Sequence, residues 1–196
     1  MKTVHLVLII FLIFIIISIL LSYRENKTVK KGCKKLHWGK DNNKLKVLNI
    51  LSKVQCEEII KEAQTYEYPI TDNKITKDWK CYSLLIENVR EYIYPTISRM
   101  YNIDPRYLEL NELVIVKYND KEILEERTNG SKNSFIIGLN DDFIGDGIRF
   151  SKGIETFKLK TGECLVFSGQ DKYGGLEVIS GTRYIIKGFI THKTTN

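Results

Sequence analysis

The sequence predicts an α+β domain with an antiparallel sheet, sandwich or barrel, preceded by one transmembrane helix. Three observations carry this prediction. An uncharged apolar run occupies residues 4–23, apolar residues recur at helical spacing within 53–101, and short strand-like segments crowd residues 110–190. Helices followed by a series of close strands are typical of α+β folds. With 196 residues, 43% of them hydrophobic, the chain is long enough for one domain with a buried core.

The apolar run reads VHLVLIIFLIFIIISILLSY and contains no Asp, Glu, Lys or Arg. Twenty residues in a helix rise about 30 Å, which matches the hydrocarbon core of a bilayer. A cleaved signal peptide would need a small-residue site, but the run ends in LLSYREN without Ala or Gly. A buried soluble helix would show a polar face, and this segment has none. Residues 1–23 are therefore predicted to be a transmembrane signal anchor.

The net charge of +6 is concentrated next to this anchor. Residues 1–40 contain eight Lys or Arg and one acidic residue, whereas residues 41–196 contain 22 basic and 23 acidic residues. We therefore expect residues 24–44 to form a basic juxtamembrane tether that faces anionic lipid, at about 1 kcal/mol per cation. A solvated stop-transfer flank is the alternative. A nearly neutral domain gives no support for nucleic-acid binding.

The signals for topology disagree. The cations that follow the apolar run place the C-terminal domain in the cytoplasm by the positive-inside rule. Two glycosylation sequons, at Asn26 and Asn129, and four Cys instead favour the lumen or the exterior. We expect a lumenal or exterior domain, with the cytoplasmic orientation as the alternative. Cys56 lies on the apolar face of a predicted helix, so we expect a buried free thiol there.

Two helices and a set of strands are predicted in the domain. Ser52 and Gln55 form a capping box for a helix over 53–66, after an apolar strand or turn at 45–51. A second helix is expected over 84–101, with a kink at Pro95. The expected strands are residues 110–118, 134–140, 147–150, 156–159, 164–168 and 182–190.

Two motifs follow one another in the second half of the chain. KTGECLVF, at 160–167, fits the pattern K-x-G-x-x-x-x-F, and YGGLEVISGTRY, at 173–184, fits H-x-x-x-x-V-x-x-G-x-R-Y apart from its first residue. With these motifs the chain resembles the prolyl 4-hydroxylase-type iron- and 2-oxoglutarate-dependent dioxygenases. The resemblance covers about residues 45–190. It implies a double-stranded β-helix, or jelly roll, with supporting helices on one side, and we place this domain at residues 45–192.

The resemblance also implies where functional residues would lie. In that family two His and one carboxylate hold Fe(II), and a basic residue binds the far carboxylate of 2-oxoglutarate. The three ligand positions fall on Arg127, Asn129 and Tyr173 of this chain. Arg183 falls on the 2-oxoglutarate anchor, and Tyr118 on a position that lines the cofactor site.

These residue types argue against a metal centre. A guanidinium has no lone pair to donate, and a neutral amide is a weak ligand. The three His of the chain, His5, His37 and His192, all lie outside the motif positions. We therefore expect no catalytic residue, no metal and no cofactor.

The leading hypothesis is a pseudoenzyme with binding or structural roles and a protein partner. The alternatives are an active Fe(II)/2-oxoglutarate-dependent hydroxylase of protein side chains, and a surface or envelope component. The Ile-, Lys- and Asn-rich composition is typical of an AT-rich genome, such as a viral or parasitic one. If the pocket persists without metal, Arg127 and Arg183 are expected to bind a small anion or dicarboxylate, accompanied by Glu125 or Glu126.

The anchor prediction is testable by alkaline carbonate extraction of membranes that contain the full-length protein. We expect the protein to stay in the membrane pellet and to keep its own N-terminus, because an uncleaved apolar helix holds it there. Release into the supernatant with a new N-terminus near residue 23 would show a cleaved signal peptide instead.

Overall fold

The computed structural model describes residues 15–17, 45–66, 73–151 and 156–193. Apart from 15–17, which are helical, the predicted anchor and tether lie outside these residues. Within the described ranges, no helix combines the length and apolar character needed to cross a membrane.

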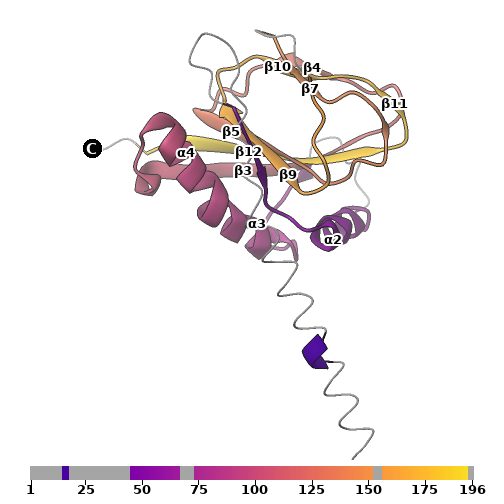
Figure 1. Cartoon of the computed structure of the whole chain (residues 1–196), viewed down its shortest axis with the longest axis horizontal. Coiled ribbons are helices and arrows are strands. Elements are labelled where there is room, and N and C mark those ends of the chain that lie inside the picture. Colours follow the sequence, from indigo (N-terminus) through magenta and orange to yellow (C-terminus); the bar gives the residue numbers. More distant parts are fainter. Residues whose placement is uncertain (1–14, 18–44, 67–72, 152–155, 194–196) are drawn as a thin grey trace, which may run out of the picture.

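Two antiparallel sheets pack face to face (Figure 1). The larger sheet has the order β1-β9-β5-β12-β3-β2 and the smaller one β4-β10-β7-β8. The strands of the larger sheet are β1 (Lys46–Asn49), β9 (Glu163–Ser168), β5 (Asn133–Gly138), β12 (Arg183–His192), β3 (Leu108–Tyr118) and β2 (Asn73–Lys74). Those of the smaller sheet are β4 (Leu124–Arg127), β10 (Tyr173–Gly175), β7 (Ile148–Phe150) and β8 (Thr156–Phe157). A separate pair joins β11 (Val178–Ser180) and β6 (Ile144–Gly145). The predicted α+β class with an antiparallel sandwich is confirmed.

Helices cover the outer face of the larger sheet (Figure 1). The capping box at Ser52 and Gln55 is present and starts α2 (Lys53–Ala63). The second predicted helix is divided into α3 (Tyr82–Asn88), a π-helical turn η1 (Val89–Ile93) and α4 (Tyr94–Tyr101). Pro95 lies in the first turn of α4. Because proline cannot donate the usual i→i−4 hydrogen bond, the wider turn directly before it is the expected kink.

Strand β12 separates two cores. Tyr184, Ile186 and Ile190 belong to the core under the helices, whereas Ile185 and Phe189 belong to the core between the sheets. Since alternate residues of a strand face opposite sides, Arg183 and Lys187 share the inner face with Ile185. Both are almost fully buried, at 5% and 3% exposure. The fold therefore carries two cationic side chains on the inner face of its larger sheet.

The sequence patterns missed β4 and β10. Their sequences, LEER and YGG, show no alternation of apolar and polar residues. These strands form because they pair with each other and, for β10, with β7. They matter for function because they carry two of the residues that the resemblance singles out.

Candidate functional site

The structure brings the three expected ligand positions together. Tyr173 of β10 stands opposite Arg127 of β4 in the strand register. Asn129 follows β4 by two residues, and its Oδ1 accepts a hydrogen bond of 3.0 Å from the Tyr173 hydroxyl. Two residues that are 44 positions apart in the chain are thus in direct contact, as their places in the motifs of the resemblance imply.

A hydrogen-bond chain extends from this contact into β5. The Asn129 side-chain amide donates to Ser134 Oγ at 2.8 Å, and Ser134 Oγ lies 2.8 Å from Ser131 Oγ. Ser131 and Ser134 are buried. Sequence reasoning missed both serines, because a single serine in a turn or at the start of a strand carries no pattern that marks it as functional. We call Tyr173, Asn129, Ser134 and Ser131 the hydroxyl–amide network.

Aromatic rings pack around the buried end of this network. Tyr173 is 0% exposed. Its ring centroid lies 5.0 Å from that of Phe167 in an edge-on arrangement and 6.0 Å from that of Phe150. Edge-to-face and tilted contacts at these distances are favourable. The interior next to Tyr173 is therefore filled by side chains.

Arg183 lies apart from the network, in a closed environment. Its guanidinium carbon is 4.6 Å from the ring centroid of Tyr118 and 5.8 Å from that of Phe143. Nη1 donates to the Asp146 carbonyl at 3.3 Å, while Nε has no hydrogen-bond partner among the described residues. Burial lowers the pKa of Arg183 from its ordinary value.

The free space beside Arg183 is small. The cavity that it lines measures about 20 Å³. Gly175 contributes to the close packing, because a Cβ at this position would stand 2.8 Å from Arg183 Nη2. Since about 10–15 Å³ of such volume holds one water, this cavity has room for a single water molecule.

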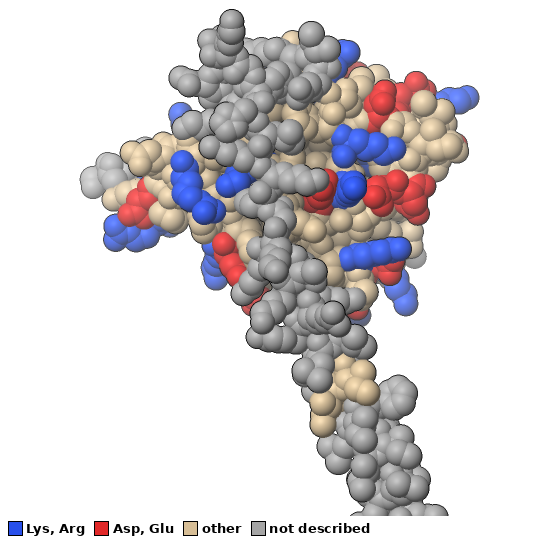
Figure 2. Space-filling model, viewed as in Figure 1, with Lys and Arg blue, Asp and Glu red and all other residues tan. Residues whose placement is uncertain are grey.

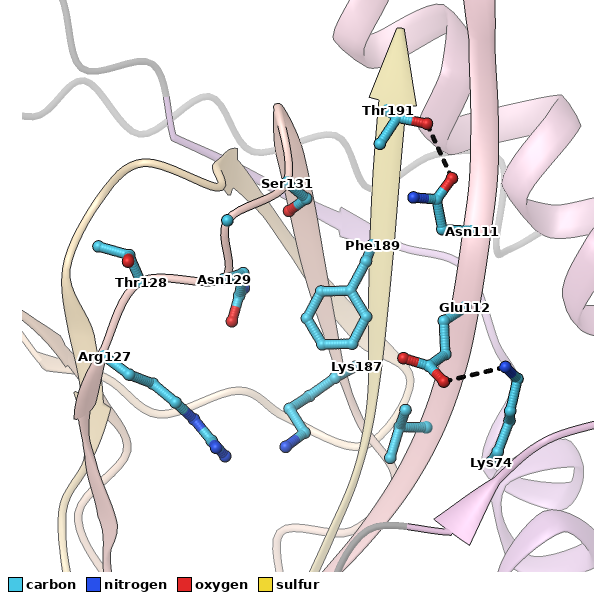
Figure 3. A pocket seen from close by; sticks show the side chains of 12 residues that line it. Lys74, Asn111, Glu112, Arg127, Thr128, Asn129, Ser131, Lys187, Phe189 and Thr191 are labelled. Atoms are coloured by element: carbon cyan, nitrogen blue, oxygen red, sulfur yellow. Dashed lines mark hydrogen bonds and ion pairs between the residues drawn. The ribbon is translucent and has the colours of Figure 1, made fainter. Parts of the chain in front are cut away.

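A second and much larger cavity opens on the other side of Asn129. It measures about 620 Å³ and is lined by Arg127, Asn129, Lys187 and Phe189 among others (Figure 3). Arg183 is not among its lining residues. Arg127 and Arg183, which were expected in one cavity, thus line two different cavities, and the buried Lys187 lines the same cavity as Arg127. The alternation along β12 was the available sequence signal for Lys187.

The expected acidic neighbours are arranged differently too. Glu126 forms an ion pair of 3.3 Å with Lys172 rather than with Arg127. Among the described residues, the carboxylate that lines the larger cavity belongs to Glu112, which pairs with Lys74 at 3.1 Å. Among the described residues, no group of three or more His, Cys, Asp or Glu is close enough together to hold a metal ion. His192 lies at the end of β12, with Nε2 2.8 Å from Asn133 Oδ1.

Two features that bear on topology are internal to the domain. The Asn129 side chain is held by Tyr173 and Ser134, so glycosylation there would have to break the network. Cys56, Cys81 and Cys164 are buried free thiols, as expected for Cys56. Burial raises the pKa of Cys56 and of Cys81 to about 12.

Figure 2 shows basic and acidic side chains interspersed on the visible face of the domain.

Comparison with known proteins gives structural matches only. No family model matches the chain, and no curated protein matches it in sequence. The viral collagen prolyl hydroxylase of Paramecium bursaria Chlorella virus-1, in complex with 2OG, matches with a TM-score of 0.64 and 13% identity, over 76% of this chain and 96% of that one. A Pseudomonas putida prolyl-4-hydroxylase matches with a TM-score of 0.59 and 12% identity, over 76% and 93%.

A third solved structure extends the match. An oxidoreductase of the 2OG-Fe(II) oxygenase family from Burkholderia pseudomallei has a TM-score of 0.52 and 11% identity, over 88% of this chain and 79% of that one. Identities this low show the fold alone. The domain has the jelly-roll fold of the prolyl hydroxylase-type 2OG-Fe(II) oxygenases.

Proposed function

We propose that this protein is a membrane-anchored pseudoenzyme, in which a prolyl 4-hydroxylase-like domain binds a ligand or partner and does not oxidise it. The observation that carries the proposal is the hydrogen bond from the buried Tyr173 hydroxyl to Asn129 Oδ1. It joins two of the three positions at which the resemblance implies iron ligands. This contact supports a hydrogen-bond network in place of the metal centre that the resemblance implies.

The residues present do not fit ferrous iron. Arg127 offers a permanent cation without a donor lone pair. Tyr173 uses its hydroxyl proton for the bond to Asn129, and a phenol of ordinary acidity would have to lose that proton to bind a metal well. The Asn129 amide nitrogen is committed to Ser134. A metal at this point would have to break two hydrogen bonds and lie beside a guanidinium.

The space beside Arg183 does not fit 2-oxoglutarate either. A cavity of about 20 Å³ cannot hold a five-carbon dicarboxylate. Rings of Tyr118 and Phe143 and the backbone at Gly175 surround the guanidinium. Arg183 is thus better described as a structural cation, stabilised by aromatic faces and a carbonyl.

An active 2-oxoglutarate-dependent hydroxylase of protein side chains is the second candidate. One observation favours it: Arg183 Nε is buried without a hydrogen-bond partner among the described residues, as an anchor awaiting a carboxylate would be. Leaving a buried donor unsatisfied costs about 1–3 kcal/mol, so the atom calls for an explanation. A single water in the small cavity would accept a hydrogen bond from Arg183 Nε, and this explanation needs no cofactor.

The proposal includes a membrane anchor at residues 1–23, a basic tether at 24–44 and a protein partner for the domain. The Asn129 side chain is held by two hydrogen bonds, so its sequon does not support a lumenal location. The three described cysteines are free thiols and therefore do not support it either. A lumenal or exterior domain now rests on the resemblance, because many proteins of that family are type II secretory-pathway proteins.

The network is tested by Tyr173→Phe. Removing the hydroxyl deprives Asn129 Oδ1 of its donor, so the free energy of unfolding should fall by about 1–2 kcal/mol. Urea denaturation of the full-length protein measures this change. Tyr107→Phe is the matched control, because Tyr107 is 40% exposed and lies outside the network. Equal stability of the two variants would contradict the role given to Tyr173.

The pseudoenzyme proposal is tested by calorimetric titration with Co(II) and by an assay for succinate release from 2-oxoglutarate with Fe(II). The wild type should bind no metal at this site and release no succinate. The triple variant Arg127→His, Asn129→Asp, Tyr173→His should bind Co(II), because ligand types and spacing then match a facial triad.

The control for this titration is Arg127→Gln, Asn129→Ala, Tyr173→Phe, which removes the native side chains without adding ligands. It should remain unable to bind Co(II). Tight metal binding or succinate release by the wild type would overturn the pseudoenzyme proposal. A triple His/Asp variant that folds but binds no metal would show that the three positions are misaligned.

Topology is tested by protease treatment of sealed microsomes that contain the full-length protein. A lumenal domain should survive until detergent is added. Digestion without detergent would place the domain in the cytoplasm, in agreement with the basic flank and the free thiols.

A further inference from the structure

Asn129 and Gly130 form a dipeptide that can react with itself. The backbone nitrogen of a glycine can attack the side-chain amide carbon of a preceding asparagine, because glycine has no side chain that hinders the approach. Gly130 is exposed, with a φ of +68°, and a Cβ at this position would meet no described atom within 4 Å. Asn129 and Gly130 both line the larger cavity (Figure 3). The dipeptide is therefore uncrowded and open to water.

The structure holds the Asn129 side chain at both ends of its amide. Oδ1 accepts a hydrogen bond of 3.0 Å from the Tyr173 hydroxyl, and Nδ2 donates one of 2.8 Å to Ser134 Oγ. In an unrestrained chain, attack occurs when rotation brings the amide carbon onto the backbone nitrogen that follows it. A side chain that is held by two hydrogen bonds samples such rotations less often.

The backbone on both sides of the dipeptide is clamped as well. The Asn129 N–H donates to the Gly169 carbonyl at 3.1 Å, and the Gly169 N–H donates to the Lys132 carbonyl at 3.1 Å. Gln170 Nε2 donates to the Ser131 carbonyl at 3.0 Å. These contacts fasten the turn to a segment that lies about forty residues further along the chain. Attack at the amide carbon therefore requires a local opening of the turn.

We propose that Asn129 is a deamidation site, at which the hydroxyl–amide network and the clamped turn hold back the reaction. The Gly130 nitrogen loses its proton to water and forms a bond to Asn129 Cγ. The bond from Cγ to Nδ2 breaks, and the amide nitrogen takes a proton from water and leaves as ammonia. Water then opens the cyclic imide. Opening at Cγ gives aspartate, and opening at the backbone carbonyl carbon gives isoaspartate.

The product weakens the network that slowed its formation. An aspartate at position 129 has no N–H, so the hydrogen bond that Asn129 donates to Ser134 is lost in its present direction. An isoaspartate also adds a methylene group to the backbone between β4 and β5. Loss of ammonia makes the change irreversible. The inference concerns a covalent change in the chain and not the binding of a metal or ligand, so it goes beyond the proposed function.

The test is incubation of the full-length protein in detergent and EDTA at mildly alkaline pH, followed by trypsin digestion and mass spectrometry. Trypsin cleaves after Arg127 and Lys132 and so releases residues 128–132 as one peptide. The folded wild type should deamidate at least about tenfold more slowly than the same protein in guanidinium chloride, because hydrogen bonds must break first. Tyr173→Phe and Gln170→Ala should each react about threefold to tenfold faster than the wild type.

Tyr107→Phe is the matched control, because Tyr107 is 40% exposed and lies outside the network. It should react at the wild-type rate. Gln170 is exposed, so Gln170→Ala keeps the test decisive if Tyr173→Phe does not fold. Equal rates in the folded and unfolded wild type would overturn the inference, as would wild-type or slower rates in both variants. The metal titration decides the proposed function separately, since no metal is present in this experiment.

Discussion

The hydrogen bond between the buried Tyr173 hydroxyl and Asn129 is the interaction on which the candidate site depends. A hydroxyl taken out of water must find a partner or lose roughly 1–3 kcal/mol. Tyr173 finds it in a residue beyond β4, and Asn129 passes the connection to Ser134 in β5. One chain of side-chain hydrogen bonds thereby ties the smaller sheet to the larger one.

The two inward cations of β12 show how the same fold handles buried charge in different ways. Burying an ion costs several kcal/mol unless its surroundings compensate. Arg183 is surrounded by the Tyr118 and Phe143 rings and a backbone carbonyl, which leaves space for only about one water. Lys187 instead reaches a cavity of about 620 Å³. Four positions along one strand therefore separate a cation enclosed by aromatic rings from a cation that lines a large cavity.

The sequence predicted what depends on local pattern. The cap at Ser52, the interruption of the helix next to Pro95 and the course of β12 follow from neighbours in the chain, and all three are present. The convergence of Tyr173 with Asn129 came from the order of the motifs. The sequence could not predict contacts that depend only on how distant parts of the chain pack together. Strands β4 and β10 have no periodicity of their own, and Ser131 and Ser134 show no pattern that marks a hydrogen-bond network. The cavity beside Arg183 depends on rings from other strands.

The domain shares its fold with 2OG-Fe(II) oxygenases, and the proposed function differs from theirs in the interior of that fold. The jelly roll places strand ends around a central point, and the residue types at that point decide whether a metal or a hydrogen-bond network forms there. Anomalous diffraction at the manganese absorption edge, from crystals of the wild-type protein grown with Mn(II), tests this directly. The account predicts no anomalous peak beside Tyr173, and a Tyr173 hydroxyl within hydrogen-bond distance of Asn129 Oδ1. A peak coordinated by Tyr173 or Asn129 would contradict it.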